Sequence, residues 1–241
     1  MATAAAHALS GQIPDPTELA EGELARSRTT RARILDAGIR CLVEEGFKGL
    51  STVTVARRAG ITRAAMLYHF PSRNELLVAI IHHITRRRVA YFETAFSALP
   101  HDRSFAARAL DAVIDELSTP EFLAYAELAL AARTNPELAE TMRPAMAAYD
   151  DARVALGHRF CPSRLTEAPD FGLARDVVRF LCEGIALQFA ALRGMRQPGE
   201  RLAQLRHFLR LLVSSPEGFR LLERTAAEAP GLPPFMPHPR G

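Results

Sequence analysis

Residues 33–77 read RILDAGIRCLVEEGFKGLSTVTVARRAGITRAAMLYHFPSRNELL, and this stretch decides the fold. Ser51 and Thr62 each precede a short amphipathic run and can serve as N-caps, because a hydroxyl accepts a hydrogen bond from an N–H group that has no partner within the helix. Gly60 lies between the two runs and supplies the backbone freedom that a tight turn requires. The stretch therefore predicts two short helices joined as a helix-turn-helix unit.

The rest of the chain is also helical in its periodicity. Apolar residues recur at three- and four-residue spacing, and no stretch shows the sustained alternation of β-branched residues that marks strands. Thr119-Pro120 and Asn135-Pro136 each combine a capping side chain with proline at the first helical position, which indicates two helix starts. Pro144 predicts a kink in the second of these helices. We expect an all-α fold of about nine helices, near 30–45, 52–59, 63–69, 73–98, 103–118, 120–132, 136–160, 169–194 and 199–214.

The composition of the 241 residues is that of an ordinary globular protein, with 48% hydrophobic and 24% charged residues. No apolar run reaches the roughly 18 residues that a membrane span needs, and the first residues lack the pattern of a secretory signal, so we expect a cytoplasmic protein. Cys41, Cys161 and Cys182 are widely spaced and form no CxxC motif. This excludes a disulfide framework and a thiolate zinc site, and we expect no metal and no cofactor.

Positive charge is concentrated in one segment of the sequence. From Arg26 to Arg88 there are 13 Arg and Lys against four Asp and Glu, a balance of +9, although the net charge of the whole chain is only +3. A compact basic segment favours a polyanion partner, most often nucleic acid, although a solvated surface gives the same pattern. Within the segment, we interpret Arg86-Arg87-Arg88 as stabilising the negative end of a helix dipole rather than as a DNA contact.

The sequence resembles the TetR family of bacterial transcriptional regulators. The matching motifs lie in the family's order and at its spacing, and they cover about a fifth of the chain. They are Gly46-Phe47, Ser51-Thr52-Val53, Val55-Ala56, Ala59-Gly60-Ile61-Thr62-Arg63, His69-Phe70-Pro71-Ser72-Arg73 and Glu75-Leu76-Leu77.

The resemblance implies roles for residues of the helix-turn-helix. Ser51 and Thr52 would touch phosphate, and His69 and Arg73 would hold the DNA backbone. Thr62, Arg63 and Ala64 would face base edges, where Arg63 could donate two hydrogen bonds to a guanine. The family usually places a phosphate-binding tyrosine two residues before the histidine, and this position is Leu67 here. The contact therefore shifts to Tyr68 or is missing.

The composition of the two ends and the resemblance together predict the organisation of the chain. We expect a mobile N-terminal arm over 1–27, a helix-turn-helix DNA-binding domain over 28–75, a helical domain for effector binding and dimerisation over 76–215, and a loose proline-rich tail over 216–241. Members pair through their last two long helices into a homodimer. The apolar faces of these helices in this chain predict an interface of Leu181, Ile185, Leu202, Leu205, Leu209 and Leu212.

A small-molecule pocket is the second site that the resemblance implies. Aromatic and methionine side chains on the middle helices could line it, although such residues form core more often than pocket. The ligand class that they favour is a mostly apolar small molecule. The candidate residues are Phe92, Phe96, Phe122, Tyr125, Met142, Met146, Tyr149 and Phe189.

The function predicted from the sequence is that of a transcriptional regulator, most simply a repressor that binds a near-palindromic double-stranded DNA operator as a homodimer and is released by a small-molecule effector. Three alternatives stay open. One is a three-helix subdomain with no ligand, and another is an effector-free DNA-binding or adaptor protein. An enzyme is disfavoured, because the sequence contains no HExxH, Walker, GxGxxG or GxSxG motif.

Overall fold

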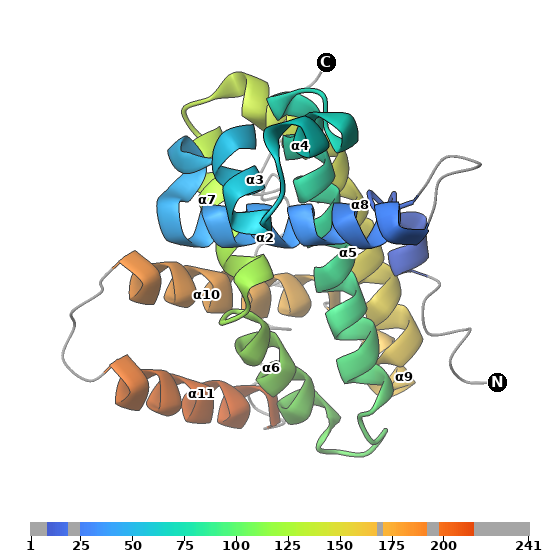
Figure 1. The fold of residues 1–241 in the computed structure, drawn as a ribbon. Coiled ribbons are helices and arrows are strands. Elements are labelled where there is room, and N and C mark those ends of the chain that lie inside the picture. Colours follow the sequence, from blue (N-terminus) through green and yellow to red (C-terminus); the bar gives the residue numbers. More distant parts are fainter. Residues whose placement is uncertain (1–8, 19–24, 168–170, 192–197, 215–241) are drawn as a thin grey trace. The chain divides into compact units, whose positions relative to one another are not determined.

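The computed structural model describes residues 9–18, 25–167, 171–191 and 198–214, and every regular element in these ranges is a helix. The predicted all-α fold is therefore confirmed. Helices α3, α4, α7 and α8 have the predicted bounds, whereas η1 and α9 are absent from the prediction. In chain order the elements are η1 (Ser10–Gln12), α2 (Ala25–Gly49), α3 (Thr52–Ala59), α4 (Arg63–His69), α5 (Arg73–Ser97), α6 (Phe105–Glu116), α7 (Pro120–Ala132), α8 (Pro136–Phe160), α9 (Ser163–Thr166), α10 (Phe171–Ala191) and α11 (Pro198–Ser214) (Figure 1).

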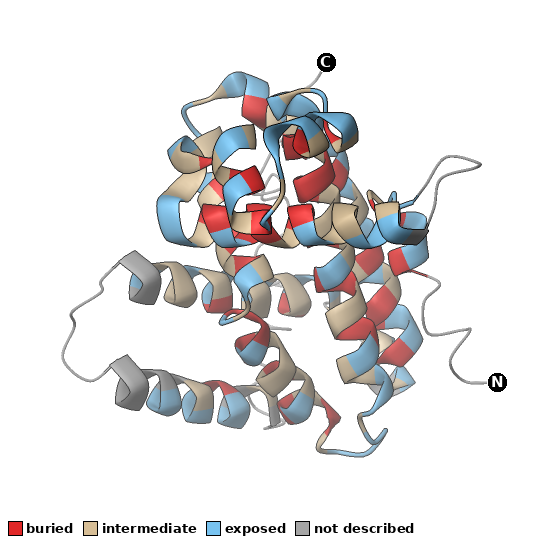
Figure 2. Ribbon diagram, in the orientation of Figure 1, coloured by how far each residue is buried: buried red, intermediate tan, exposed pale blue. Residues whose placement is uncertain are grey.

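The chain divides into two compact units, residues 1–98 with 112–160 and residues 99–111 with 161–241. The predicted boundary at residues 75 and 76 is not a boundary between these units. The reason is that the core of the helix-turn-helix, around Val55 and Met66, continues into α7 and α8 as one buried cluster, visible as the red residues of the upper helices in Figure 2. From α7 and α8 the cluster includes Ala124, Leu128, Leu138, Met142 and Ala145.

The caps and the turn of the helix-turn-helix form as predicted. Ser51 Oγ accepts a hydrogen bond from Thr54 N at 3.0 Å, and Thr62 Oγ1 accepts one from Ala65 N at 3.1 Å. Between α3 and α4, Gly60 has φ 65° and ψ 40°, a left-handed conformation in which a side chain would be strained. Local sequence signals therefore explain where both short helices begin and where the first one ends.

Glycine also interrupts α2, close to the predicted end of this helix at residue 45. Gly46 has φ 72° and ψ −178°, which breaks the helix before its last short turn. The Glu127 carboxylate of α7 accepts a hydrogen bond from Phe47 N at 2.8 Å, and a Cβ at Gly46 would lie 2.9 Å from Glu127 Oε1. The break therefore brings a carboxylate of α7 against the end of α2.

The predicted mobile arm over 1–27 is wrong for residues 9–18, which we call the N-terminal strap. Glu93 of α5 is buried and accepts hydrogen bonds from Leu9 N at 3.0 Å and Ser10 Oγ at 2.7 Å. Arg86 of the same helix donates to the Ile13 carbonyl at 2.8 Å, and the Ile13 side chain is only 2% exposed. Sequence patterns do not reveal the strap, because Glu93 and Arg86, which bind its first residues, lie more than 70 residues away. The rest of the predicted arm, except Ala25, Arg26 and Ser27 of α2, and the predicted tail over 216–241 lie outside the described residues.

The three consecutive arginines lie in the middle of α5, so the expected role at its negative end is wrong. Arg88 and Glu116 of α6 form a buried ion pair, in which Nε donates to Oε1 at 2.6 Å. The Arg88 guanidinium lies 4.4 Å from the ring centroids of both Tyr125 and Tyr149. Each arginine points to a different neighbour, since successive side chains on a helix are about 100° apart.

In the second unit, α10 and α11 run roughly antiparallel (Figure 1). Arg206 and Arg210 of α11 lie 3.9 Å and 3.5 Å from the Asp111 carboxylate of α6. Large apolar side chains stay exposed along α10, at helical spacing on one face. They are Leu173, Val177, Phe180 and Leu181.

Candidate nucleic-acid interface

The second helix of the helix-turn-helix, α4, has an inner face that anchors it and an outer face that is free to contact another molecule. Met66 and Phe70, four residues apart, are buried in the core. On the outer face Arg63 and Ala64 are exposed, and Tyr68 is exposed to 71%. Among the described residues no carboxylate pairs with Arg63. This helix therefore presents an unpaired cation and short side chains at its start, as direct contacts to base edges require.

Tyr68 stands out from the end of α4, beside the site where the expected phosphate-binding tyrosine is absent. Its ring contacts the His69 ring edge-on, with centroids 5.1 Å apart. Leu67, which replaces the expected tyrosine, is also partly exposed, at 37%. The exposed Tyr68 hydroxyl is thus available for the phosphate contact that Leu67 cannot make.

At the start of α3, the hydroxyl of Ser51 makes two contacts within the protein. It accepts from Thr54 N and lies 2.9 Å from Thr54 Oγ1. Ser51 and Thr52 are both half-buried. Since the first N–H groups of a helix and its positive dipole end attract anions, this helix start can hold a phosphate group near Thr52.

Arg73, predicted to hold the DNA backbone, is exposed and makes contacts within this chain. Its Nε donates to the Leu50 carbonyl at 2.9 Å, and its guanidinium lies 4.9 Å from the centroid of the Phe47 ring. These contacts fasten the start of α5 to the end of α2. Arg73 therefore has a structural role that sequence reasoning missed, and a phosphate contact would be additional to it.

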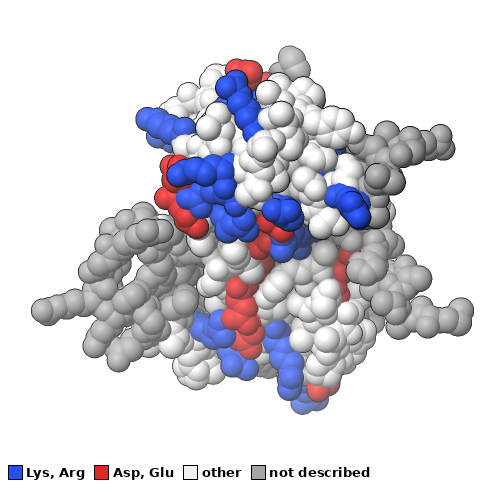
Figure 3. Space-filling model, viewed as in Figure 1, with Lys and Arg blue, Asp and Glu red and all other residues white. Residues whose placement is uncertain are grey.

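Some of the basic charge of the segment is neutralised by pairs within it. Arg58 of α3 pairs with Glu44 and Glu45 of α2, each at 2.6 Å. On the face in Figure 3, Lys and Arg side chains gather over the upper helices, with acidic side chains beside them. The pairing joins α3 to α2, so Arg58 positions the unit, whereas Arg63 and Lys48 remain exposed at its surface.

Comparison with known proteins agrees with this geometry. A family model described as bacterial regulatory proteins, tetR family, matches residues 34–80. An uncharacterised HTH-type transcriptional regulator of Mycobacterium tuberculosis is 28% identical over 131 residues, which are 54% of this chain and 67% of the relative. The comparisons support a DNA-binding transcriptional regulator of the TetR family, and the model of this family covers residues 34–80 of the chain.

Two solved structures share the fold. A transcriptional regulator from Rhodococcus has a TM-score of 0.58 and 22% identity, over 78% of this chain and all of that one. The multidrug binding protein EbrR, in a complex with imidazole, has a TM-score of 0.50 and 28% identity, over 74% of this chain and 93% of that one.

The residues predicted to line an effector pocket mostly lie in the interior. Met142 belongs to the core shared with the helix-turn-helix, and Phe92, Phe122 and Tyr149 are buried. Phe96 and Tyr125 are half-buried, Met146 is exposed, and the side chain of Phe189 lies outside the described residues. Aromatic spacing thus identified buried positions on these helices but did not distinguish core from cavity.

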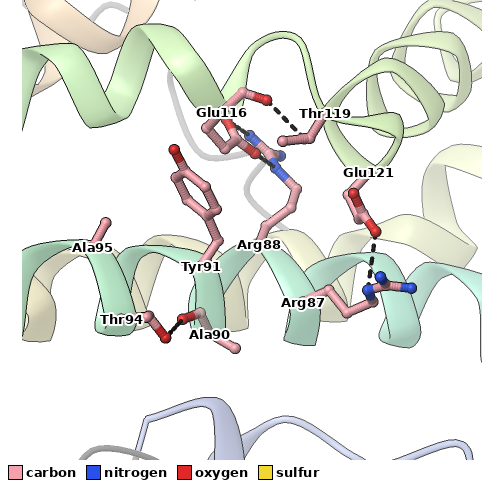
Figure 4. A pocket seen from close by; sticks show the side chains of 9 residues that line it. All are labelled: Arg87, Arg88, Ala90, Tyr91, Thr94, Ala95, Glu116, Thr119 and Glu121. Atoms are coloured by element: carbon pink, nitrogen blue, oxygen red, sulfur yellow. Dashed lines mark hydrogen bonds and ion pairs between the residues drawn. The ribbon is translucent and has the colours of Figure 1, made fainter.

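A cavity of about 580 Å³ lies instead between α5 and the chain that joins α6 to α7. Figure 4 shows Tyr91 and Arg88 rising from α5 toward Glu116 and Thr119. The Tyr91 hydroxyl donates to the Ala112 carbonyl at 3.2 Å, and burial raises the pKa of Tyr91. The lining is Arg87, Arg88, Ala90, Tyr91, Thr94, Ala95, Glu116, Thr119 and Glu121.

One side chain of this cavity, Arg87, also reaches α2, the helix that packs against α3 of the helix-turn-helix. Its Nε lies 2.9 Å from Glu121 Oε1, and its NH1 donates to Asp36 Oδ1 of α2 at 2.6 Å. Asp36 Oδ1 is also 3.1 Å from His83 Nε2. This hydrogen bond and the Arg87 charge lower the pKa of Asp36. Sequence reasoning missed Arg87 and Asp36, which lie about 50 residues apart in the chain.

The residues predicted for the dimer interface are divided between surface and interior. Leu181 is exposed and Ile185 is half-buried, but Leu209 is only 1% exposed within the single chain. Leu209 therefore has little surface left for a partner. Among the described side chains of α11, the large apolar ones that are exposed are Phe208 and Leu211, each one position away from the predicted row. The side chains of Leu202, Leu205 and Leu212 lie outside the described residues.

None of the described helices is both long and apolar enough to cross a membrane. The same part of the chain contains no group of three or more His, Cys, Asp or Glu residues that could hold a metal ion.

Proposed function

We propose that this protein is a repressor that binds a near-palindromic operator in the cytoplasm as a homodimer. The observation that carries the proposal is the outer face of α4, where Arg63, Ala64 and Tyr68 are exposed on a helix held by buried Met66 and Phe70. A helix presented in this way fits the major groove, and a two-fold dimer would place two of them roughly 34–36 Å apart. In this proposal the protein recognises DNA and catalyses no reaction.

The dimer supplies the symmetry that a near-palindromic operator requires. Support comes from the exposed row of Leu173, Val177, Phe180 and Leu181 on α10. A row of apolar side chains is unfavourable when it is exposed to water, and a second copy of the chain that packs against the row removes it from water. We place the interface on this row, with Leu181 as the residue common to it and the prediction from sequence.

The effector site that we propose is the cavity between α5 and α7. Its volume of about 580 Å³ is in the range of small-molecule sites. Alanine, tyrosine and threonine side chains offer apolar surface, which suits a mostly apolar ligand, and the related EbrR is described as a multidrug binding protein. Because Arg87 joins the cavity to Asp36 of α2, a ligand that moves α5 against α7 would act on the helix-turn-helix unit.

DNA recognition is tested by selecting duplexes from a random-sequence library with the purified protein. We expect an enriched near-palindrome that binds at least 10³-fold more tightly than random competitor DNA, with affinity falling steeply as salt rises. Recovery of no sequence preference at moderate salt would refute the proposed function.

The effector site is tested by filling the cavity. Ala95→Phe should abolish the response to every compound that releases wild-type protein from the selected duplex, while DNA binding itself persists. Ala147→Phe, at an exposed position of α8, is the matched control and should respond like the wild type. A full ligand response in Ala95→Phe would place the effector elsewhere.

A further inference from the structure

One side chain, that of Arg31, connects the N-terminal strap to α4, the helix that we propose reads DNA. Arg31 of α2 lies between the two, with Nε donating to the Pro16 carbonyl of the strap at 2.9 Å. Its NH1 donates to the carbonyl of His69, the last residue of α4, at 3.3 Å. The guanidinium also lies 4.8 Å from the centroid of the Phe70 ring, which is buried just after α4.

The contact at His69 is one that the end of α4 needs. The last carbonyl groups of a helix have no donor within it, and the partial negative charge at that end attracts a cation. The Arg31 guanidinium supplies both a hydrogen-bond donor and a positive charge at this end of α4. Since α4 has only seven residues, this contact at its end adds to the anchoring by buried Met66 and Phe70.

The strap in turn holds Arg31 in place. Its Leu9 and Ser10 are bound by the buried Glu93 carboxylate, and Ile13 is buried against the body. Arg86 of α5 donates to the carbonyls of Ser10 and Ile13 at 3.0 Å and 2.8 Å. The Pro16 carbonyl is therefore a fixed acceptor, and it restricts the Arg31 side chain to the geometry that also reaches α4.

We propose that Arg31, held by the N-terminal strap, is a positioning residue that sets the orientation of α4 for sequence-specific DNA binding. This inference rests on the proposed function. Arg31 need not touch DNA, because both of its hydrogen bonds run to main-chain carbonyls of this chain. Its loss should reduce specific binding more than non-specific binding, since only base contacts depend closely on the orientation of the helix.

The test measures affinity for the duplex selected by the wild type and for a random duplex, with the full-length chain. Arg31→Gln should weaken specific binding roughly tenfold, as expected when a hydrogen bond to a charged group is lost, and change non-specific binding little. Arg28→Gln is the matched control, because it removes the same charge one helical turn earlier. The Arg28 side chain contacts Asp15 of the strap but not α4. It should retain the ratio of specific to random affinity.

The role of the strap is tested with Ile13→Glu, which places a charge at a buried position and should release the strap. Alone it should lower the ratio of specific to random affinity as Arg31→Gln does. Combined with Arg31→Gln it should add little, because the two changes break one connection. Circular dichroism melting at each step checks that the variants are folded at the temperature of the binding assay.

Three outcomes would overturn the inference. One is a wild-type ratio in folded Arg31→Gln, and another is fully multiplicative losses in the double variant. The third is a salt slope smaller by about 0.9 in Arg31→Gln, which would mark Arg31 as a phosphate contact instead. Failure of the wild type to prefer any duplex would instead refute the proposed function, so the two failures are distinguishable.

Discussion

At the scale of residues, three adjacent arginines of one helix have three different partners. Arg86 binds the N-terminal strap, Arg87 joins α2 to α7, and Arg88 is buried with Glu116. From sequence they form a single basic run, and its length and charge say nothing about partners. What separates the three side chains is the rotation of about 100° per residue around the helix, together with the elements packed on each side.

The buried pair predicts a large loss of stability when one partner is neutralised. In Glu116→Gln the Arg88 guanidinium stays buried without its countercharge, so the free energy of unfolding should fall by about 3–5 kcal/mol in urea denaturation. Glu140→Gln, which removes an exposed carboxylate paired with Arg143, should change it by less than about 0.5 kcal/mol. Equal stability of the two variants would contradict the burial of the pair.

Substitution of Arg73 should affect both stability and DNA binding, because its guanidinium makes contacts within this chain. Arg73→Ala should lower the free energy of unfolding by about 1–2 kcal/mol through the lost hydrogen bond to the Leu50 carbonyl. If Arg73 also contacts phosphate, the affinity for all duplexes should fall alike and the salt slope should decrease by about 0.9. Urea denaturation and binding at several salt concentrations separate the two effects, and unchanged stability would argue against the internal role.

At the scale of elements, the predictability of each helix depends on how local its signals are. Ser51, Thr62, Pro120 and Pro136 mark helix starts through contacts within one turn, and the bounds of these helices follow from the sequence. The N-terminal strap depends on Glu93, which no local pattern connects to it. Likewise, periodicity places aromatic residues on inner faces but does not tell which of them border a cavity.

The link from α2 to α5 predicts a dependence of stability on pH. The hydrogen bond from His83 and the Arg87 charge lower the pKa of Asp36, so the folded state favours the carboxylate. This contribution is complete above about pH 4, the ordinary carboxyl range, and is lost as the pH falls below it. Asp36→Asn should therefore cost about 0.5 kcal/mol at pH 6, a small value because the side chain is 41% exposed, and less at pH 3.

Urea denaturation at both pH values measures this difference. Asp151→Asn, at an exposed site on α8, is the control and should follow the wild type at each pH. A cost of Asp36→Asn that stays constant from pH 6 to pH 3 would show that the carboxylate charge is not involved.

At the scale of the whole molecule, the proposed function depends on two copies of the chain acting together. The prediction that the last two long helices pair follows from the family resemblance, and their apolar periodicity does not tell which of their rows face outward. The exposed row lies on α10, and Leu209 of the predicted row is buried within one chain. Which face of an amphipathic helix is left exposed depends on how its neighbours pack, and this is not encoded in the spacing of that helix alone.

The proposed interface predicts that a charge on the exposed row of α10 separates the dimer. Phe180→Glu should shift the mass measured by light scattering to that of one chain, and it should weaken binding to a two-half-site duplex far more than to a half-site. Val154→Glu, at an exposed apolar position of α8, should remain dimeric. A dimeric Phe180→Glu would move the interface to another surface.

The central claim is that the outer face of α4 reads DNA sequence, and the most direct measurement is a titration of wild type and Arg63→Ala against every single-base variant of the selected duplex. The wild type should discriminate by about 1–3 kcal/mol at one base pair in each half-site, and Arg63→Ala should lose this discrimination at that base pair while keeping it at others. Retention of the full discrimination pattern in folded Arg63→Ala, with only a uniform loss of affinity, would contradict the claim.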